Sequence, residues 1–260
     1  MHLGRSLCLS LGFCSIFSFA SSLQAEDLFL TDGSEMPGKL WLSTNGNPMS
    51  PVHARQGRPD RAYPNAIMKL QQVAVTPDNK VFFCSGLDGS MMHLLDGRHE
   101  IQSFEFEGQV RDLACTGEND TVYFSVVPTP QNGAPLADGT IYRRNFGEGQ
   151  PTVVATVRQA DVGGNWWGTF TIRNGEIFIA TLESSSRIFR VAGDNVTPAF
   201  ETRGVKLSGL TAGADGAFYY TTGEGKVFKT TDFSMAESVL STPRRLTDVA
   251  VRPAVGSPRP

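Results

Sequence analysis

A short pattern of polar and apolar positions occurs five times along the chain. Each copy begins with a small residue, continues with a variable and an aliphatic residue, and ends with a ring or a ring-like side chain. The copies are Gly38-Lys39-Leu40-Trp41, Ser90-Met91-Met92-His93, Gly139-Thr140-Ile141-Tyr142, Ser186-Arg187-Ile188-Phe189 and Gly225-Lys226-Val227-Phe228. An internal repeat of about 40 residues that is built from strands indicates a β-propeller.

Each repeat carries the same order of strand signals. Alternating small and aliphatic residues, as in 110–115 (VRDLAC), predict an innermost strand that packs on both faces. A turn with Gly, Asn or Asp follows, and then a strand rich in aromatic and β-branched residues, as in 122–124 (VYF). The repeated pattern supplies the third strand, and a more variable segment supplies the fourth. The innermost strands are expected at 70–75, 110–115, 168–172, 207–212 and 246–251.

The last repeat stops after its innermost strand, and the missing strands stand at the other end of the chain. Residues 27–31 (DLFLT) are typical of a second strand, 38–42 of a third, and 49–54 of a fourth. Joining both ends in one blade pairs the terminal strands and removes two open sheet edges. We therefore predict an all-β fold, a five-bladed β-propeller over residues 26–253, with a disordered tail at 254–260.

The cadence of these strands and turns resembles that of NHL-repeat proteins and of regucalcin/gluconolactonase-like propellers. The resemblance covers most of the predicted domain and implies the fold. Lactonases of this type bind a divalent metal through acidic and Asn side chains near the starts of innermost strands. The equivalent positions here are Gln71, Arg111, Gly168, Ser208 and Thr247, and none of them is Asp, Glu or Asn. The resemblance therefore does not carry the metal site or the lactonase activity across.

The first residues are typical of a secretory signal peptide. Arg5 precedes an apolar stretch from Leu7 to Phe19, and Ala20 or Ala25 supplies the small residue expected at a cleavage site. The alternative, a retained anchor, is disfavoured because a bilayer span needs about 20 predominantly apolar residues. We predict a signal peptide at residues 1–25 and a secreted or periplasmic protein.

The charge of the chain argues against nucleic acid as a partner, and its cysteines allow two interpretations. The chain has 23 Lys and Arg against 26 Asp and Glu, a formal net charge of −3, and no basic stripe, so nucleic acid is not an expected partner. After signal cleavage no apolar segment is long enough for a membrane anchor. Cys84 and Cys115 then remain. They form either a disulfide in an oxidising compartment or two small buried apolar side chains.

Every unusually long loop belongs to one face of the predicted ring. Residues 53–69, 126–139 and 156–167 all enter innermost strands or join second to third strands. We refer to this side as the long-loop face, and we expect the ligand there, because binding residues concentrate on loops that a rigid scaffold positions.

Acidic residues of this face are the candidates for chemistry. Asp112 and Asp248 lie near the starts of innermost strands, and Glu183 lies in a loop between second and third strands. They are candidate ligand-binding residues, and the two aspartates are also candidate metal ligands for a divalent cation or a carboxylate pair. The alternative is that each aspartate accepts hydrogen bonds from backbone amides of the neighbouring blade.

Two adjacent tryptophans complete the candidate site. Trp166 and Trp167 follow the Gly-rich segment 163–165, where a ring is either a platform on which a sugar stacks or a plug between blades. His93 stands at the aromatic position of the repeated pattern, so we interpret it as a core residue.

The sequence favours a secreted binding or interaction module for a small molecule, a glycan or a protein. The alternative is a metal-dependent hydrolase, lactonase-like or glycosidase-like, that uses the axial carboxylates. Two aspartates that converge with a third carboxylate and have shifted pKa values would favour catalysis. Aspartates engaged in hydrogen bonds between blades would favour the module.

Overall fold

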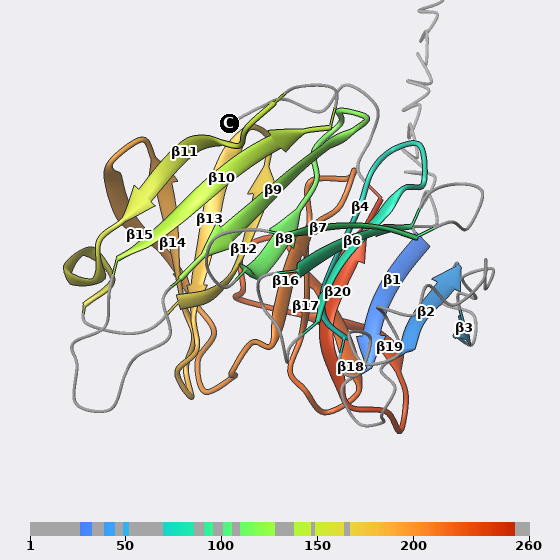
Figure 1. The fold of residues 1–260 in the computed structure, drawn as a ribbon. Coiled ribbons are helices and arrows are strands. Elements are labelled where there is room, and N and C mark those ends of the chain that lie inside the picture. Colours follow the sequence, from blue (N-terminus) through green and yellow to red (C-terminus); the bar gives the residue numbers. More distant parts are fainter. Residues whose placement is uncertain are drawn as a thin grey trace, which may run out of the picture.

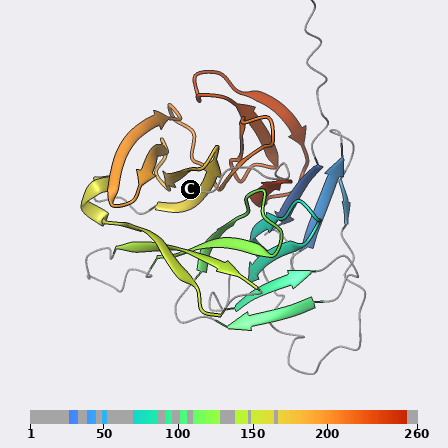
Figure 2. The same ribbon diagram turned by 90° about the horizontal axis from the view of Figure 1, so that it is seen from above.

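Five four-stranded antiparallel sheets surround a common axis in the computed structural model of the protein (Figure 1, Figure 2). The structure describes residues 27–32, 39–44, 49–51, 70–85, 91–95, 101–105, 110–127, 138–146, 149–163 and 167–252. The predicted signal peptide and tail lie outside these residues, as do most of the long loops. The innermost strands contact one another in the order β20, β4, β8, β12, β16 and back to β20, which closes the ring.

Each sheet is one blade. Its strands run outward from the axis in chain order, except that blade 1 begins with the C-terminal β20. Blade 1 is β20 (Leu246–Val251), β1 (Asp27–Asp32), β2 (Lys39–Thr44) and β3 (Ser50–Pro51). Blade 2 is β4 (Leu70–Val75), β5 (Val81–Ser85), β6 (Met91–Leu95) and β7 (Ile101–Glu105). Blade 3 is β8 (Val110–Ala114), β9 (Thr121–Val126), β10 (Gly139–Asn145) and β11 (Thr152–Val157). Blade 4 is β12 (Trp167–Arg173), β13 (Glu176–Thr181), β14 (Arg187–Ala192) and β15 (Asn195–Glu201). Blade 5 is β16 (Gly209–Ala212), β17 (Phe218–Thr221), β18 (Lys226–Thr230) and β19 (Glu237–Ser241).

The first and the last described strands meet in blade 1, as the sequence predicts. The C-terminal β20 pairs with the N-terminal β1, with Leu28 opposite Val251 and Leu30 opposite Val249 (Figure 1). The ring is therefore closed by hydrogen bonds between strands that are far apart in the sequence. The predicted fold class and the shared blade are confirmed.

The core among the described residues consists of five apolar clusters, each made by two neighbouring blades. The cluster between blades 3 and 4, for example, joins Ile141 and Val157 to Trp167 and Phe170. His93 belongs to this interior, because it is fully buried and stacks on Phe83 with ring centroids 5.1 Å apart. Its interpretation as a core residue is confirmed. Blades are thus held together mainly by apolar burial between their faces.

Contacts in the tertiary structure explain why the first residue of the repeated pattern is small. Gly225 has a φ of +75°, and a Cβ on it would lie 2.1 Å from the carbonyl oxygen of Thr242. Only glycine fits such a position without strain. Ser186, the equivalent residue of blade 4, accepts a hydrogen bond on its Oγ from the backbone N–H of Leu207 at 3.0 Å. In both blades the small residue lies against the segment that leads into the next blade.

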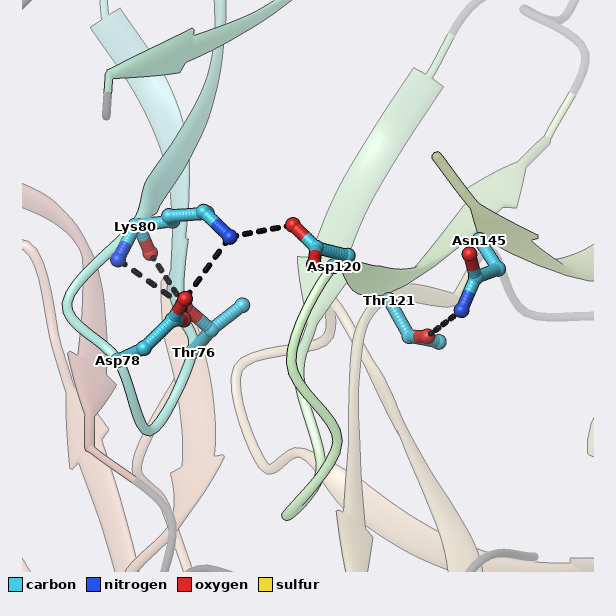
Figure 3. Close-up of polar contacts among 6 residues, drawn as sticks. All are labelled: Thr76, Asp78, Lys80, Asp120, Thr121 and Asn145. Carbon is cyan, nitrogen blue, oxygen red and sulfur yellow. Dashed lines mark hydrogen bonds and ion pairs between the residues drawn. The ribbon is translucent and has the colours of Figure 1, made fainter. Parts of the chain in front are cut away.

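The face opposite the long loops consists of short turns, some of which are joined by ion pairs. Asn79, Asp120 and Asn174 adopt positive φ in these turns, as Asn and Asp do most readily among residues with a side chain. Figure 3 shows Lys80 of blade 2 between Asp78, 2.8 Å away, and Asp120 of blade 3. These groups are partly exposed, so each pair contributes little stability, at most about 1 kcal/mol.

No helix in the described part of the chain has the length and apolar character needed to cross a membrane. The helical element there is a short 3-10 turn, η1 (Gln159–Val162), which leads toward β12 on the long-loop face.

Candidate functional site

Asp112 occupies the third position of β8 and is almost fully buried, with 2% of its surface exposed. Its Oδ2 accepts hydrogen bonds from the Thr169 hydroxyl at 2.6 Å and from the Phe170 N–H at 2.7 Å. Its Oδ1 accepts one from the Leu113 N–H at 2.8 Å. Since Thr169 and Phe170 belong to β12, the Asp112 carboxylate joins the innermost strands of blades 3 and 4.

Asp248 occupies the same position of β20 and is equally buried, again with 2% exposed. Its Oδ2 accepts a hydrogen bond from the Val73 N–H of β4 at 2.8 Å, which joins blades 1 and 2. Its Oδ1 has no hydrogen-bond partner. This oxygen lies above Gly209 of β16, where an added Cβ would come within 2.1 Å of it. The absence of a side chain at residue 209 makes room for the Asp248 carboxyl group.

The two aspartates therefore act as straps between consecutive innermost strands. The equivalent residues of the other blades are Gln72, Thr169 and Gly209. Two of these three participate in the straps, Thr169 as a donor and Gly209 as the space beside Asp248. A carboxylate fits at this position only where the neighbouring innermost strand offers a donor, as Thr169 does, or free space, as Gly209 does.

Burial dominates the ionisation of this pair. It raises the pKa of Asp112 from its ordinary 3.8 to about 7, although the three hydrogen bonds favour the ionised form. Burial and the nearby charge of Asp112 together raise the pKa of Asp248 well above 3.8. Hydrogen bonds from the backbone N–H groups of Val73 and Val249 oppose the rise in the pKa of Asp248 without cancelling it.

We expect the free energy of unfolding to decrease as pH rises from about 4 to about 7. An acid whose pKa is higher in the folded state gives its full stabilisation below its unfolded pKa, here 3.8, and loses it as pH rises through the folded pKa. Each unit of raised pKa corresponds to about 1.4 kcal/mol. Urea denaturation at half-unit steps of pH measures the effect.

The control for this profile is the variant Asp248→Asn, whose side chain does not titrate. His93 contributes with the opposite sign, because burial lowers its pKa and its stabilisation is lost as pH falls. The difference between the parent and the variant isolates the contribution of Asp248, because Asp112 and His93 titrate in both proteins. Identical pH profiles for the two proteins would contradict a raised pKa of Asp248 in the folded state.

Glu183 is engaged elsewhere on the long-loop face. It forms an ion pair with Arg187, with Oε1 and Nη2 3.0 Å apart, and Arg187 in turn donates to the carbonyl oxygen of Val162 in η1 at 3.3 Å. Glu183 is not among the groups that shift the pKa of Asp112 or Asp248. The three predicted acids are thus not coupled as one site, and the basic residue that pairs with Glu183 was not predicted.

A second ion pair on the same face, between Arg244 and Asp32, was also not predicted from the sequence. Arg244 lies 3.0 Å from Asp32 and places its guanidinium carbon 4.0 Å from the centroid of the Trp41 ring. Asp32 is the last residue of β1, while Arg244 precedes β20. No spacing in the sequence relates the two residues, because the contact depends on the closure of blade 1.

The tryptophan pair separates into one packed and one undescribed residue. Trp167 has no exposed surface and fills the interface between blades 3 and 4, so of the two predicted alternatives it is the plug. A ring without an exposed face has nothing on which a ligand can stack. Trp166 lies outside the described residues.

Neither the two cysteines nor any cluster of potential metal ligands forms a site among the described residues. Cys84 and Cys115 are free, and burial raises the pKa of both thiols. No group of three or more His, Cys, Asp or Glu side chains is arranged to hold a metal ion in the described part of the chain.

Of the comparisons with known proteins, the search of solved structures bears on the architecture. No protein-family model matches the chain, and no curated protein matches its sequence. A crystal structure of a candidate gluconolactonase from the Northeast Structural Genomics Consortium matches with a TM-score of 0.52 and 14% identity, over 87% of this chain and 84% of that one. The chain is therefore similar in fold to a gluconolactonase-type propeller, and at this identity the likeness extends to the fold alone.

Two further structures match over most of this chain. A protein of unknown function from Bacteroides thetaiotaomicron has a TM-score of 0.49 and 12% identity, over 82% of this chain and 64% of that one. YCF48 bound to D1 peptide has a TM-score of 0.43 and 13% identity, over 78% of this chain and 63% of that one. The chain spans less than two thirds of the length of either.

Proposed function

We propose that the protein is an exported ligand-binding or interaction module, with its ligand on the long-loop face. The observation that carries the proposal is the use of the two axial carboxylates. Asp112 and Asp248 both accept backbone N–H groups of the next innermost strand. The two Oδ2 atoms that stabilise the ring in this way are not free to bind a metal or to transfer a proton to a substrate.

Access supports the same conclusion. A general acid or base must come within hydrogen-bond reach of the substrate or of a bridging water. Asp112 and Asp248 are nearly inaccessible, and Glu183 is paired with Arg187 instead of joining them. A binding role requires no such convergence, and the ring supplies a rigid support for variable loops.

The described part of the long-loop face is polar and mixed in charge. It presents Glu183 with Arg187 on blade 4, and on blade 1 it presents Arg244, whose partner Asp32 is buried. Paired carboxylate and guanidinium groups suit a ligand with several hydrogen-bonding groups, such as a glycan or a polar peptide segment. Export rests on the signal peptide predicted at residues 1–25.

A metal-dependent hydrolase is the second candidate. It is favoured by Asp248, whose buried Oδ1 has no hydrogen-bond partner and whose pKa is raised. Perturbed carboxyl groups of this kind occur at catalytic sites. The two candidates differ in whether a cation binds at this oxygen.

A thermal-shift screen of the mature domain distinguishes the two. We expect Ca²⁺, Zn²⁺, Mn²⁺ and EDTA to leave the melting temperature unchanged, and a member of a panel of sugars and peptides to raise it. A ligand at a hundred times its Kd stabilises the folded state by about 2.7 kcal/mol, which corresponds to a rise of roughly 5–10 °C for a domain of this size. A metal-dependent rise that Asp248→Asn abolishes would instead show that a cation binds at this oxygen, and it would favour the hydrolase candidate.

A further inference from the structure

A pocket of about 470 Å³ opens on blade 4, beside the short turns of the face opposite the long loops. It is lined by charged residues near the β12–β13 turn and by the outermost strand β15, notably Arg173, Glu176, Phe178, Arg190, Pro198 and Phe200. Its volume falls within the range of small-molecule sites, roughly 300–1,000 Å³. None of these residues belongs to the candidate site described above.

Arg173 is held in place at the inner end of this pocket by blade 5. Its Nη1 donates to the carbonyl oxygen of Thr231 at 3.1 Å, and its guanidinium carbon lies 4.5 Å from the centroid of the Phe218 ring. Its Nε is buried and has no hydrogen-bond acceptor. A guanidinium group that is held in a fixed position in the lining of a pocket is suited to bind an anion.

Arg190 supplies a second positive charge that is more loosely held. Its Nη1 lies 3.2 Å from Glu176, and the side chains of the two residues are 51% and 45% exposed. An exposed ion pair of this kind contributes little, so a ligand carboxylate can replace Glu176 at little cost. Arg190 lies directly opposite Phe178 and Thr197 in the sheet, so it stands between the ring and the outer strand.

An apolar wall runs beside the two cations. Phe178 and Phe200 stack with centroids 6.2 Å apart, and Pro198 and Ala199 continue this wall along β15. Aromatic and aliphatic surface next to a fixed cation matches a ligand with an apolar body and one acidic end.

We propose that this pocket binds a small carboxylate with an aromatic body. The carboxylate accepts hydrogen bonds from Arg190 and Arg173, because a guanidinium group binds a carboxylate through parallel N–H donors. The ring of the ligand packs on Phe200 and Pro198. This site is separate from the ligand site proposed on the long-loop face, and its failure would leave that proposal unaffected.

Isothermal titration with phenylacetate as the probe tests the proposal. 2-Phenylethanol, which has the ring without the charge, and acetate, which has the charge without the ring, are the matched ligands. We expect saturable binding of phenylacetate and at least about tenfold weaker binding of both analogues, since each lacks one of the two contacts.

Two variants and one control assign the binding to the pocket. Arg190→Gln removes the exposed cation, and Ala199→Trp fills the pocket from an exposed position of the outer strand, so neither disturbs the core. We expect each to weaken phenylacetate at least about tenfold. Arg158→Gln changes an exposed arginine that is also paired with an acid but lies outside the pocket, and it should bind like the parent. Absence of saturable binding, or equal affinity in parent, Arg190→Gln and Ala199→Trp, would overturn the proposal.

Discussion

Replacing Asp112 by alanine is expected to lower the free energy of unfolding by about 3–5 kcal/mol. The substitution leaves the N–H groups of Phe170 and Leu113 and the hydroxyl of Thr169 without their acceptor in a buried layer. Each buried donor that loses its partner costs about 1–3 kcal/mol. Urea denaturation followed by circular dichroism at pH 7 measures the loss.

The matched comparison uses asparagine at both aspartates. Asp112→Asn retains one acceptor oxygen where three donors converge, so we expect a loss of about 2–3 kcal/mol. Asp248→Asn keeps the oxygen that Val73 needs and removes a buried acid whose second oxygen has no partner, so we expect a change of less than about 1 kcal/mol. If Asp112→Ala were as stable as the parent, Asp112 would not be a strap, and a role in ligand binding would become the better explanation.

The second large effect is expected for Trp167→Ala, at about 3–5 kcal/mol of unfolding free energy. Trp167 is fully buried between blades 3 and 4, and its ring lies against Gly139, where an added Cβ would come within 2.6 Å of it. Removing a large buried ring loses its transfer free energy and leaves a cavity that the neighbouring strands fill incompletely. Denaturation by urea at constant pH measures the loss.

A surface substitution in the same part of the ring serves as the control. Val153 of β11 is 62% exposed, so Val153→Ala should change stability by less than about 0.5 kcal/mol. A Trp167→Ala protein that keeps the parent stability but loses a ligand would show that the ring is a binding surface after all.

The architecture was predictable because its signals are local and repeated. Alternation of small and aliphatic residues marks the innermost strands, and Asn79, Asp120 and Asn174 mark turns by adopting backbone conformations that most residues avoid. The shared blade followed from an incomplete last repeat and from the strands it lacks at residues 27–51. The strand and turn pattern of one repeat is a weak signal, but its recurrence in five repeats is reliable because all blades pack in the same way.

The location of the candidate site residues could be predicted from the sequence, but their role could not. The sequence placed Asp112 and Asp248 near the axis and left open whether they bind a ligand or hold blades together. Their hydrogen-bond partners Phe170 and Val73 are 58 and 175 residues away, respectively. Since such contacts form only when the ring closes, no local pattern identifies them. The same holds for the contact of Arg244 with Asp32, which joins the two ends of the chain.

The sequence by itself determined the strand order, the number of blades and the closure of the ring, because periodicity and turn chemistry act over a few neighbouring residues. Only the tertiary structure decided that Trp167 is a plug, that Cys84 and Cys115 are free thiols, and that a charged pocket lies on blade 4. These properties depend on burial and on distances between blades. Both are set by the apolar contacts between sheets, which bring together residues that the sequence keeps far apart.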